Sequence, residues 1–127
     1  MEINIPTNIC HNETEIVNSN NVATAVGSGN VEVFATPAMI ALMEKTANNS
    51  VSKLLPSDCV SVGVEINTKH IKASGIGNTI SCKSELVKVD GKKLFFNILA
   101  YDNEGLIGEA NHTRVIVNRE KFLSNLK

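Results

Sequence analysis

The fold is decided by one stretch of the chain, residues 34–47, FATPAMIALMEKTA. Thr36 suits the N-cap of a helix, because its hydroxyl can accept from a free backbone N–H of the first turn. Pro37 suits the first helical position, where a missing N–H costs nothing. Residues 38–43 are all apolar, so we expect protein to surround this part of the helix. What needs explaining is the carboxylate of Glu44, which follows directly.

After Pro56 the hydrophobic period changes from that of a helix to that of a strand. Apolar residues alternate with polar residues or glycine up to His70, which predicts a half-buried strand. The apolar positions are Val60, Val62, Val64 and Ile66. Asp90-Gly91 is a strong hairpin signal between two further strands. Besides the strand that ends near His70, we expect strands over residues 13–18, 79–89, 93–101 and about 106–117.

The elements are therefore a weak strand, one helix and four antiparallel strands joined by short turns, and residues 1–127 form one domain. A single sheet cannot bury one face without a cover, and the one helix is the only cover available. We expect an α+β fold in which an antiparallel sheet wraps around one central helix, the hotdog arrangement. A hydrophobic content of 43% argues against disorder.

Composition excludes several classes of function. The formal charge of −1, with one Tyr, four Phe and no Trp, provides neither a basic surface nor stacking platforms, so we expect no nucleic-acid partner and no membrane association. The start of the chain lacks the features of a signal peptide. The three cysteines are odd in number and have no metal-like spacing, so we expect free thiols, a cytoplasmic protein and no metal. They are Cys10, Cys59 and Cys82.

Two residues of the helix are candidates for chemistry. Glu44 either lies where the helix emerges, beside Lys45, or lines a pocket as a base or nucleophile whose pKa is tuned by burial. Thr36, besides capping the helix, would sit beside free N–H groups and the positive end of the helix dipole. That is a natural place to hold a carbonyl oxygen or an anion.

Three residues of the strands are further candidates. His70 has the parity of the apolar residues before it, so without a bulge it points toward the helix, as a core residue or a proton-transfer group. Gly63 has the opposite parity and either allows close approach of a ligand or partner or marks a bulge. Arg114 is either a clamp for a phosphate or carboxylate, or a solvated strand arginine.

Four segments carry a family resemblance, in order, from about residue 31 to residue 123. They are VFATPAMIALMEKTA, SVGVEINTKH, VDGKKLFF and AYDNEGLIGEANHTRVIVNREKF. Together they resemble the hotdog-fold acyl-CoA thioesterases of the fluoroacetyl-CoA thioesterase-like group. The resemblance implies that Thr36, Glu44 and His70 are catalytic, and that Gly63 and Arg114 bind substrate.

One segment departs from the family pattern. The fluoroacetyl-specific member has phenylalanines just before the helix, and here Gly27 and Asn30 stand at those positions. The resemblance therefore implies thioester hydrolysis but not fluoroacetyl specificity.

The sequence thus predicts hydrolysis of a small or medium acyl-CoA to the free acid and CoA, with no cofactor apart from the CoA of the substrate. A homodimer, or a dimer of such dimers, is expected. Thr36 and Glu44 lie roughly 12 Å apart along the helix, so one site would take each residue from a different chain; the alternative is a site in each chain built on Glu44 and His70. Other functions considered are a hydratase or dehydratase on the same fold, and a non-catalytic module that binds acyl-CoA or another metabolite.

Overall fold

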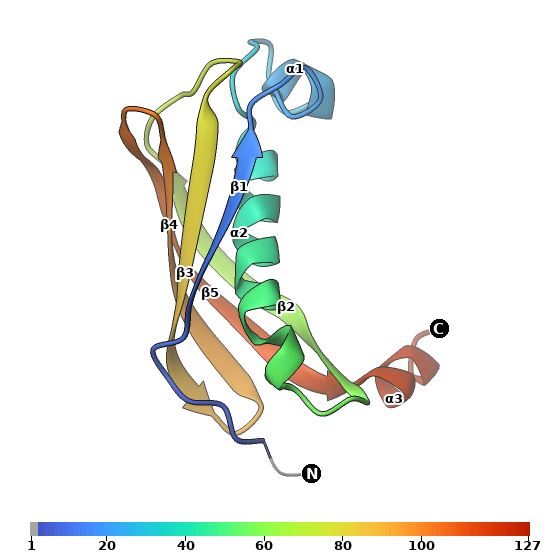
Figure 1. Cartoon of the computed structure of the whole chain (residues 1–127). Coiled ribbons are helices and arrows are strands. Elements are labelled where there is room, and N and C mark those ends of the chain that lie inside the picture. The colour runs from blue at the N-terminus through green and yellow to red at the C-terminus, as the bar shows by residue number, and fades with distance from the viewer. Residues whose placement is uncertain (1–2) are drawn as a thin grey trace.

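The computed structural model describes residues 3–127. Its strands are β1 (Cys10–Ile16), β2 (Cys59–His70), β3 (Thr79–Asp90), β4 (Lys93–Asp102) and β5 (Gly105–Asn118). Its helices are α1 (Ala23–Val26), α2 (Thr36–Val51) and α3 (Arg119–Ser124), and a 3₁₀ turn, η1 (Ser52–Leu54), follows α2. The five strands form one antiparallel sheet in the order β1-β3-β4-β5-β2, and α2 lies along one face of it (Figure 1). The predicted α+β arrangement is confirmed.

The turn between β3 and β4 follows from its glycine. Asp90 pairs with Lys93, which leaves a two-residue connection. Gly91 has a φ of +60°, in the left-handed region that glycine adopts without steric cost. The predicted hairpin at Asp90-Gly91 is therefore confirmed. The two short helices α1 and α3 were not expected from the sequence.

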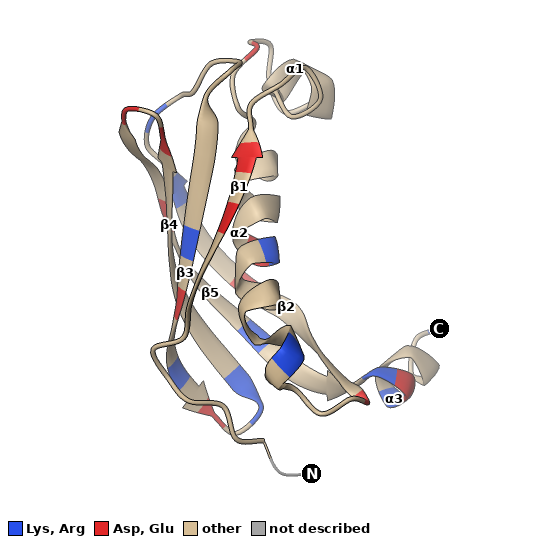
Figure 2. Cartoon of the chain, in the orientation of Figure 1, with Lys and Arg blue, Asp and Glu red and all other residues tan. Residues whose placement is uncertain are grey.

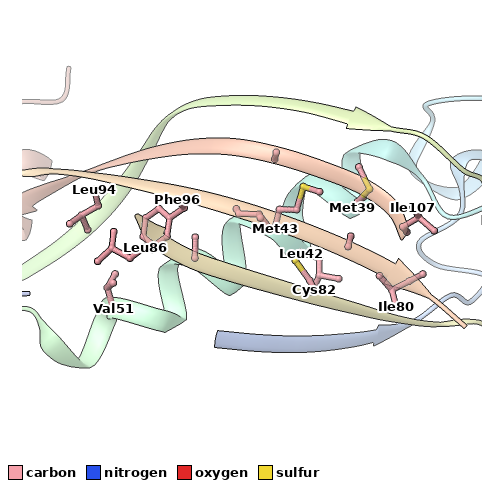
Figure 3. Packing of buried hydrophobic residues seen from close by; sticks show 14 of the residues in the cluster. Met39, Leu42, Met43, Val51, Ile80, Cys82, Leu86, Leu94, Phe96 and Ile107 are labelled. Atoms are coloured by element: carbon pink, nitrogen blue, oxygen red, sulfur yellow. The ribbon is translucent and has the colours of Figure 1, made fainter. Parts of the chain in front are cut away.

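The core lies between α2 and the sheet. Met39, Leu42 and Met43 of α2 are at most 2% exposed and face apolar residues of β3, β4 and β5 (Figure 3). On β4 the alternation predicts the core face correctly, since four alternate residues are at most 1% exposed. They are Leu94, Phe96, Ile98 and Ala100. Burial of this apolar surface is the main force that holds the helix to the sheet.

The expectation that protein surrounds the apolar run of α2 is wrong within one chain. Every fourth residue of the helix is exposed: Pro37, Ala41, Lys45 and Asn49. The sheet contacts α2 from one side, so a stripe on the opposite side faces solvent. Ala41 carries only a methyl group, and its exposure costs little.

The predicted inward face of β2 is also wrong in its first half. Cys59 and Ser61 are buried, whereas Val64 is 56% exposed. The pairing of β2 with β5 shifts register between Gly63 and Glu65. A bulge adds one residue to a strand and so exchanges the faces on which later side chains lie. His70 does reach the helix side, but because of this bulge and not through unbroken alternation.

Charged residues of both signs are distributed over the sheet and the helices (Figure 2). None of the helices within residues 3–127 is long and apolar enough to cross a membrane.

Candidate active site

One stripe of α2 faces β2. Thr36, Glu44 and Asn48 lie at multiples of four residues, so their side chains project from the same side of the helix. Thr36 contacts His70, at the end of β2, and Asn48 contacts Ser61, near its start. Helix and strand therefore run in opposite directions, and Glu44 lies over the middle of β2, at Gly63.

Thr36 and His70 form a direct pair. The Thr36 hydroxyl and His70 Nδ1 share a hydrogen bond of 2.8 Å. Thr36 is the first residue of α2, the N-cap position belongs to Ala35, and no side chain caps this end of the helix. The expectation that Thr36 caps the helix is therefore wrong, and its hydroxyl is directed to His70 instead.

The surroundings of His70 favour its neutral form. Nε2 is buried and has no hydrogen-bond partner of ordinary geometry among the described residues. Burial lowers the pKa of His70, and the nearby backbone of Lys72 offsets part of this effect. The ring of Phe34 meets the imidazole edge-on, with the ring centroids 6.4 Å apart. A neutral imidazole can accept a proton, as a shuttle must.

A cavity of about 230 Å³ opens beside the Thr36–His70 pair. Its lining includes Thr36, His70, Phe34, Ser28, Val33 and Lys72. A larger hollow of about 550 Å³ lies elsewhere, and its lining includes Asn67, Asn97 and Asn111. These asparagines are exposed and alternate with residues that face α2, so this hollow is on the opposite face of the sheet. Of these two hollows, only the cavity at Thr36 is lined by candidate residues, namely Thr36 and His70.

Arg114 is buried, so the interpretation of a solvated arginine is wrong. Only 7% of it is exposed. Nε donates to Ser61 Oγ at 2.8 Å, and Nη2 donates to the Ser61 carbonyl at 3.1 Å. Nη2 also donates to Asn48 Oδ1 at 3.4 Å. Nη1 lies 3.7 Å from Glu44 Oε2, which is the only carboxylate that the structure places in an ion pair with Arg114 within the described residues.

Gly63 is the residue that makes room for Glu44. A Cβ atom at Gly63 would lie 2.7 Å from Glu44 Oε2, closer than real Cβ contacts allow. The interpretation of Gly63 as a bulge position is confirmed, since the register shifts directly after it. Close approach of a ligand or partner stays a prediction, because the group that lies against Gly63 is a carboxylate of the same chain. The side chain of Glu44 is 43% exposed, so this carboxylate is open to solvent at the edge of the sheet.

His112 was missed from the sequence. It is 2% exposed, Nδ1 lies 2.7 Å from the carbonyl oxygen of Glu65, and Nε2 lies 3.1 Å from Arg114 Nη1. Burial lowers the pKa of His112, and the charge of Arg114 lowers it further. The available signal was its position two residues before Arg114, which places both side chains on one face of β5.

The structure thus gathers the candidates into two groups along β2. One is the Thr36–His70 pair beside the cavity. The other, which we call the Glu44 cluster, consists of Glu44, Gly63, His112 and Arg114. Among the described residues of one chain, no side-chain hydrogen bond or ion pair joins the two groups. No group of three or more His, Cys, Asp or Glu side chains in the described part of the chain is arranged to hold a metal ion.

Solved structures define the class of protein. A hot-dog-like protein from Thermanaerovibrio acidaminovorans superposes with a TM-score of 0.86 at 19% identity, over 94% of this chain and 88% of its own. A fluoroacetyl-CoA thioesterase superposes with a TM-score of 0.90 at 25% identity, over 95% of this chain and 94% of its own. A variant of that enzyme was solved in complex with acetyl-CoA. The chain therefore has the hotdog fold of these thioesterases.

Sequence comparison gives the family. The fluoroacetyl-CoA-specific thioesterase model matches residues 17–120. The fluoroacetyl-CoA thioesterase of Streptantibioticus cattleyicolor is 32% identical over 96 residues, which are 76% of this chain and 69% of that protein. The chain belongs to this family of acyl-CoA thioesterases. The family resemblance noted in the sequence and the predicted hotdog fold are both confirmed.

Proposed function

We propose that this protein hydrolyses a small acyl-CoA thioester to the free acid and CoA, using Thr36, Glu44 and His70. The observation that carries the proposal is the position of Glu44. Its carboxylate is half-exposed, lies over a glycine, and meets a buried arginine at 3.7 Å. A carboxylate held in place and open on one side can act on a substrate. The cavity of about 230 Å³ suits a small acyl group better than a long one.

The chemistry needs a group that attacks the thioester carbonyl and a place for its oxygen. The Glu44 carboxylate either attacks the carbonyl carbon itself or removes a proton from a water that attacks. In both cases the C–S bond breaks, and the CoA sulfur leaves as a thiolate that takes a proton. If the carboxylate attacks, the acyl group is left on Glu44 as a mixed anhydride, which water then hydrolyses to the free acid and the original carboxylate. Thr36 and the free N–H groups at the start of α2 would hold the carbonyl oxygen, and His70 would transfer protons. The reaction needs no cofactor beyond the CoA of the substrate.

We further propose a homodimer in which each site takes Thr36 and His70 from one chain and Glu44 from the other. Thr36 and Glu44 are separated by roughly 12 Å along α2, too far for one carbonyl group to meet both. β2 is an edge strand of the sheet, and Val64 on it is 56% exposed. An unpaired edge strand is a template for pairing with a second chain. Two-fold symmetry would then give two equivalent sites.

Complementation tests the shared site. Thr36→Ala and Glu44→Ala variants, each inactive alone, are unfolded and refolded together. In a shared-site dimer each mixed dimer has one site with both mutations and one with neither, so CoA release returns. Refolding each variant by itself is the control, and native mass spectrometry counts the mixed dimers. Mixed dimers without activity would show that each chain keeps its own site.

Thiol release from a panel of acyl-CoAs tests the activity itself. Crotonyl-CoA belongs in the panel, because hydration of its double bond without thiol release would indicate a hydratase. Binding without turnover of any substrate would indicate a non-catalytic module. We also propose a cytoplasmic location, which the free thiols of Cys10 and Cys82 support.

A further inference from the structure

We propose that His112 is a positioning residue that holds Arg114 so that its ion pair with the Glu44 carboxylate stays at 3.7 Å and does not close to hydrogen-bond distance. The proposal rests on the proposed function, in which Glu44 needs a free carboxylate. His112 is 2% exposed and its Nε2 contacts Arg114 Nη1, whereas the side chain of Glu44 is 43% exposed, so His112 would act through Arg114 and not on the substrate.

The hydrogen bonds of Arg114 leave little freedom. An arginine guanidinium has five N–H donors. Two of its nitrogens, Nε and Nη2, donate to Ser61 and Asn48. Nη1 has His112 Nε2 at 3.1 Å and Glu44 Oε2 at 3.7 Å. His112 therefore occupies one N–H of the same nitrogen that faces Glu44.

The state of His112 is set by its other nitrogen. Nδ1 lies 2.7 Å from the carbonyl oxygen of Glu65, which can only accept, so Nδ1 carries the proton and donates. In a neutral imidazole Nε2 is then an acceptor, and it matches the Nη1–H of Arg114. The ring of Phe96, with its centroid 6.1 Å from that of the imidazole, packs beside it. Glu65 directly follows the bulge, so the bulge and the imidazole orientation are linked.

Removal of Nε2 would leave an N–H of Arg114 without a partner in a buried site. An unsatisfied buried donor is costly, so the guanidinium would shift toward the remaining acceptor, Glu44. The distance of 3.7 Å would shorten to that of a charge-assisted hydrogen bond. The carboxylate would then be less available for attack on the thioester or for activation of water.

A matched pair of variants tests this. His112→Gln carries an amide oxygen at the same number of bonds from the backbone as Nε2, so it can still accept from Arg114. His112→Asn is one carbon shorter and can replace only the Nδ1 donor to Glu65. We expect kcat to fall about 10- to 100-fold in His112→Asn and to stay within about threefold of wild type in His112→Gln. In an Arg114→Ala background, His112→Asn should have no additional effect on kcat. A general packing defect would affect both variants alike.

A second measurement does not depend on activity. The chain has only two arginines, Arg114 and Arg119, and Arg119 is exposed. With ¹⁵N-labelled arginine, hydrogen exchange of the Arg114 Nε–H should be slow in the wild type and in His112→Gln. It should be about tenfold faster in His112→Asn, while Arg119 stays unchanged in all three proteins as the internal control.

The outcomes separate the two proposals. A wild type that releases no CoA from any acyl-CoA would end the proposed function, and the Arg114 exchange rates would still decide whether His112 positions Arg114. Equal losses of kcat in His112→Asn and His112→Gln, or an Arg114 exchange rate in His112→Asn equal to that of wild type, would overturn the role of His112.

Discussion

The two halves of β2 hold their polar groups in different ways. Before the bulge, Ser61 joins Asn48 and His112 in a set of hydrogen bonds that fixes Arg114 from three sides. After the bulge, His70 has one side-chain hydrogen bond, to Thr36, and lies beside a cavity. The first half is built to hold a charge in a fixed place. In the second half, the residue proposed to transfer protons lies beside a cavity, so the two halves of β2 adjoin the two parts of the proposed chemistry.

The largest effect is expected at Glu44 of α2, which lies over Gly63 in the first half of β2. Glu44→Gln keeps the shape of the side chain over Gly63 but removes its charge and basicity. We expect kcat for CoA release to fall a hundredfold or more, as for loss of a principal catalytic group. Glu109→Gln is the control, because Glu109 is exposed and lines the hollow on the other face of the sheet. Wild-type turnover in Glu44→Gln would remove Glu44 from the mechanism.

A smaller loss is expected when the position of Glu44 changes and its chemistry does not. In Gly63→Ala the new Cβ would lie 2.7 Å from Oε2, so the carboxylate must move. A displacement of about 1 Å can cost up to about 100-fold in rate, and we expect a loss of kcat of about 10- to 100-fold. Gly75→Ala is the matched control, because its Cβ would meet no atom within 4 Å. Unchanged kcat in Gly63→Ala would mean that Glu44 needs no fixed position.

Acid should destabilise the folded protein through two histidines, His70 at the end of β2 and His112, which contacts Arg114 opposite the first half of β2. Burial lowers the pKa of His70 and of His112 in the folded protein, so the unfolded chain binds protons more readily than the folded one. Their contribution to stability is complete above the ordinary histidine pKa of about 6.5 and is lost as the pH falls below it. Urea unfolding between pH 7.5 and 5.5 should therefore show a decreasing free energy of unfolding. The decrease should be smaller in His112→Gln, and a flat profile in the wild type would contradict the effect of burial.

The smallest effect concerns the acyl group itself. Gly27 and Asn30 provide no aromatic side chain before α2, so we expect little preference for fluoroacetyl-CoA over acetyl-CoA. One apolar group in a pocket changes discrimination by only about 1–3 kcal/mol. The kcat/KM values of the two substrates, measured side by side, check this, and Asn30→Phe tests whether added bulk raises the ratio. A ratio in the thousands for the wild type would contradict the expectation.

Local patterns accounted for most of the fold. The alternation in β4 and the Asp90-Gly91 turn depend on residues close in sequence, and both are present in the structure. The apolar run of α2 predicted its place against the sheet correctly and its exposed stripe wrongly. The hydrophobic pattern shows which residues of a helix are apolar. A residue as small as Ala41, however, is compatible with a buried or an exposed position.

Only part of the candidate site could be predicted from local sequence patterns. Thr36, Glu44 and His70 were singled out because a polar residue in an apolar setting requires a reason. His112 gave no such signal, because a histidine between polar neighbours on a strand is typical of a surface position. His112 is buried because its side chain lies on the same face of β5 as that of Arg114, and that face is set by the pairing of β5 with β2.

The long helix, the five strands, their order and the polar residues that they carry could be predicted from the sequence alone, because helix and strand periods, turns and hairpins are set by neighbouring residues. Only the tertiary structure decided which of those polar residues meet. Gly63 lies opposite Arg114, and the bulge before Glu65 exchanges the faces of β2, through pairing with a strand distant in sequence. Register between distant strands is set by the packing of the whole core, and a shift of one residue moves every later side chain to the other face.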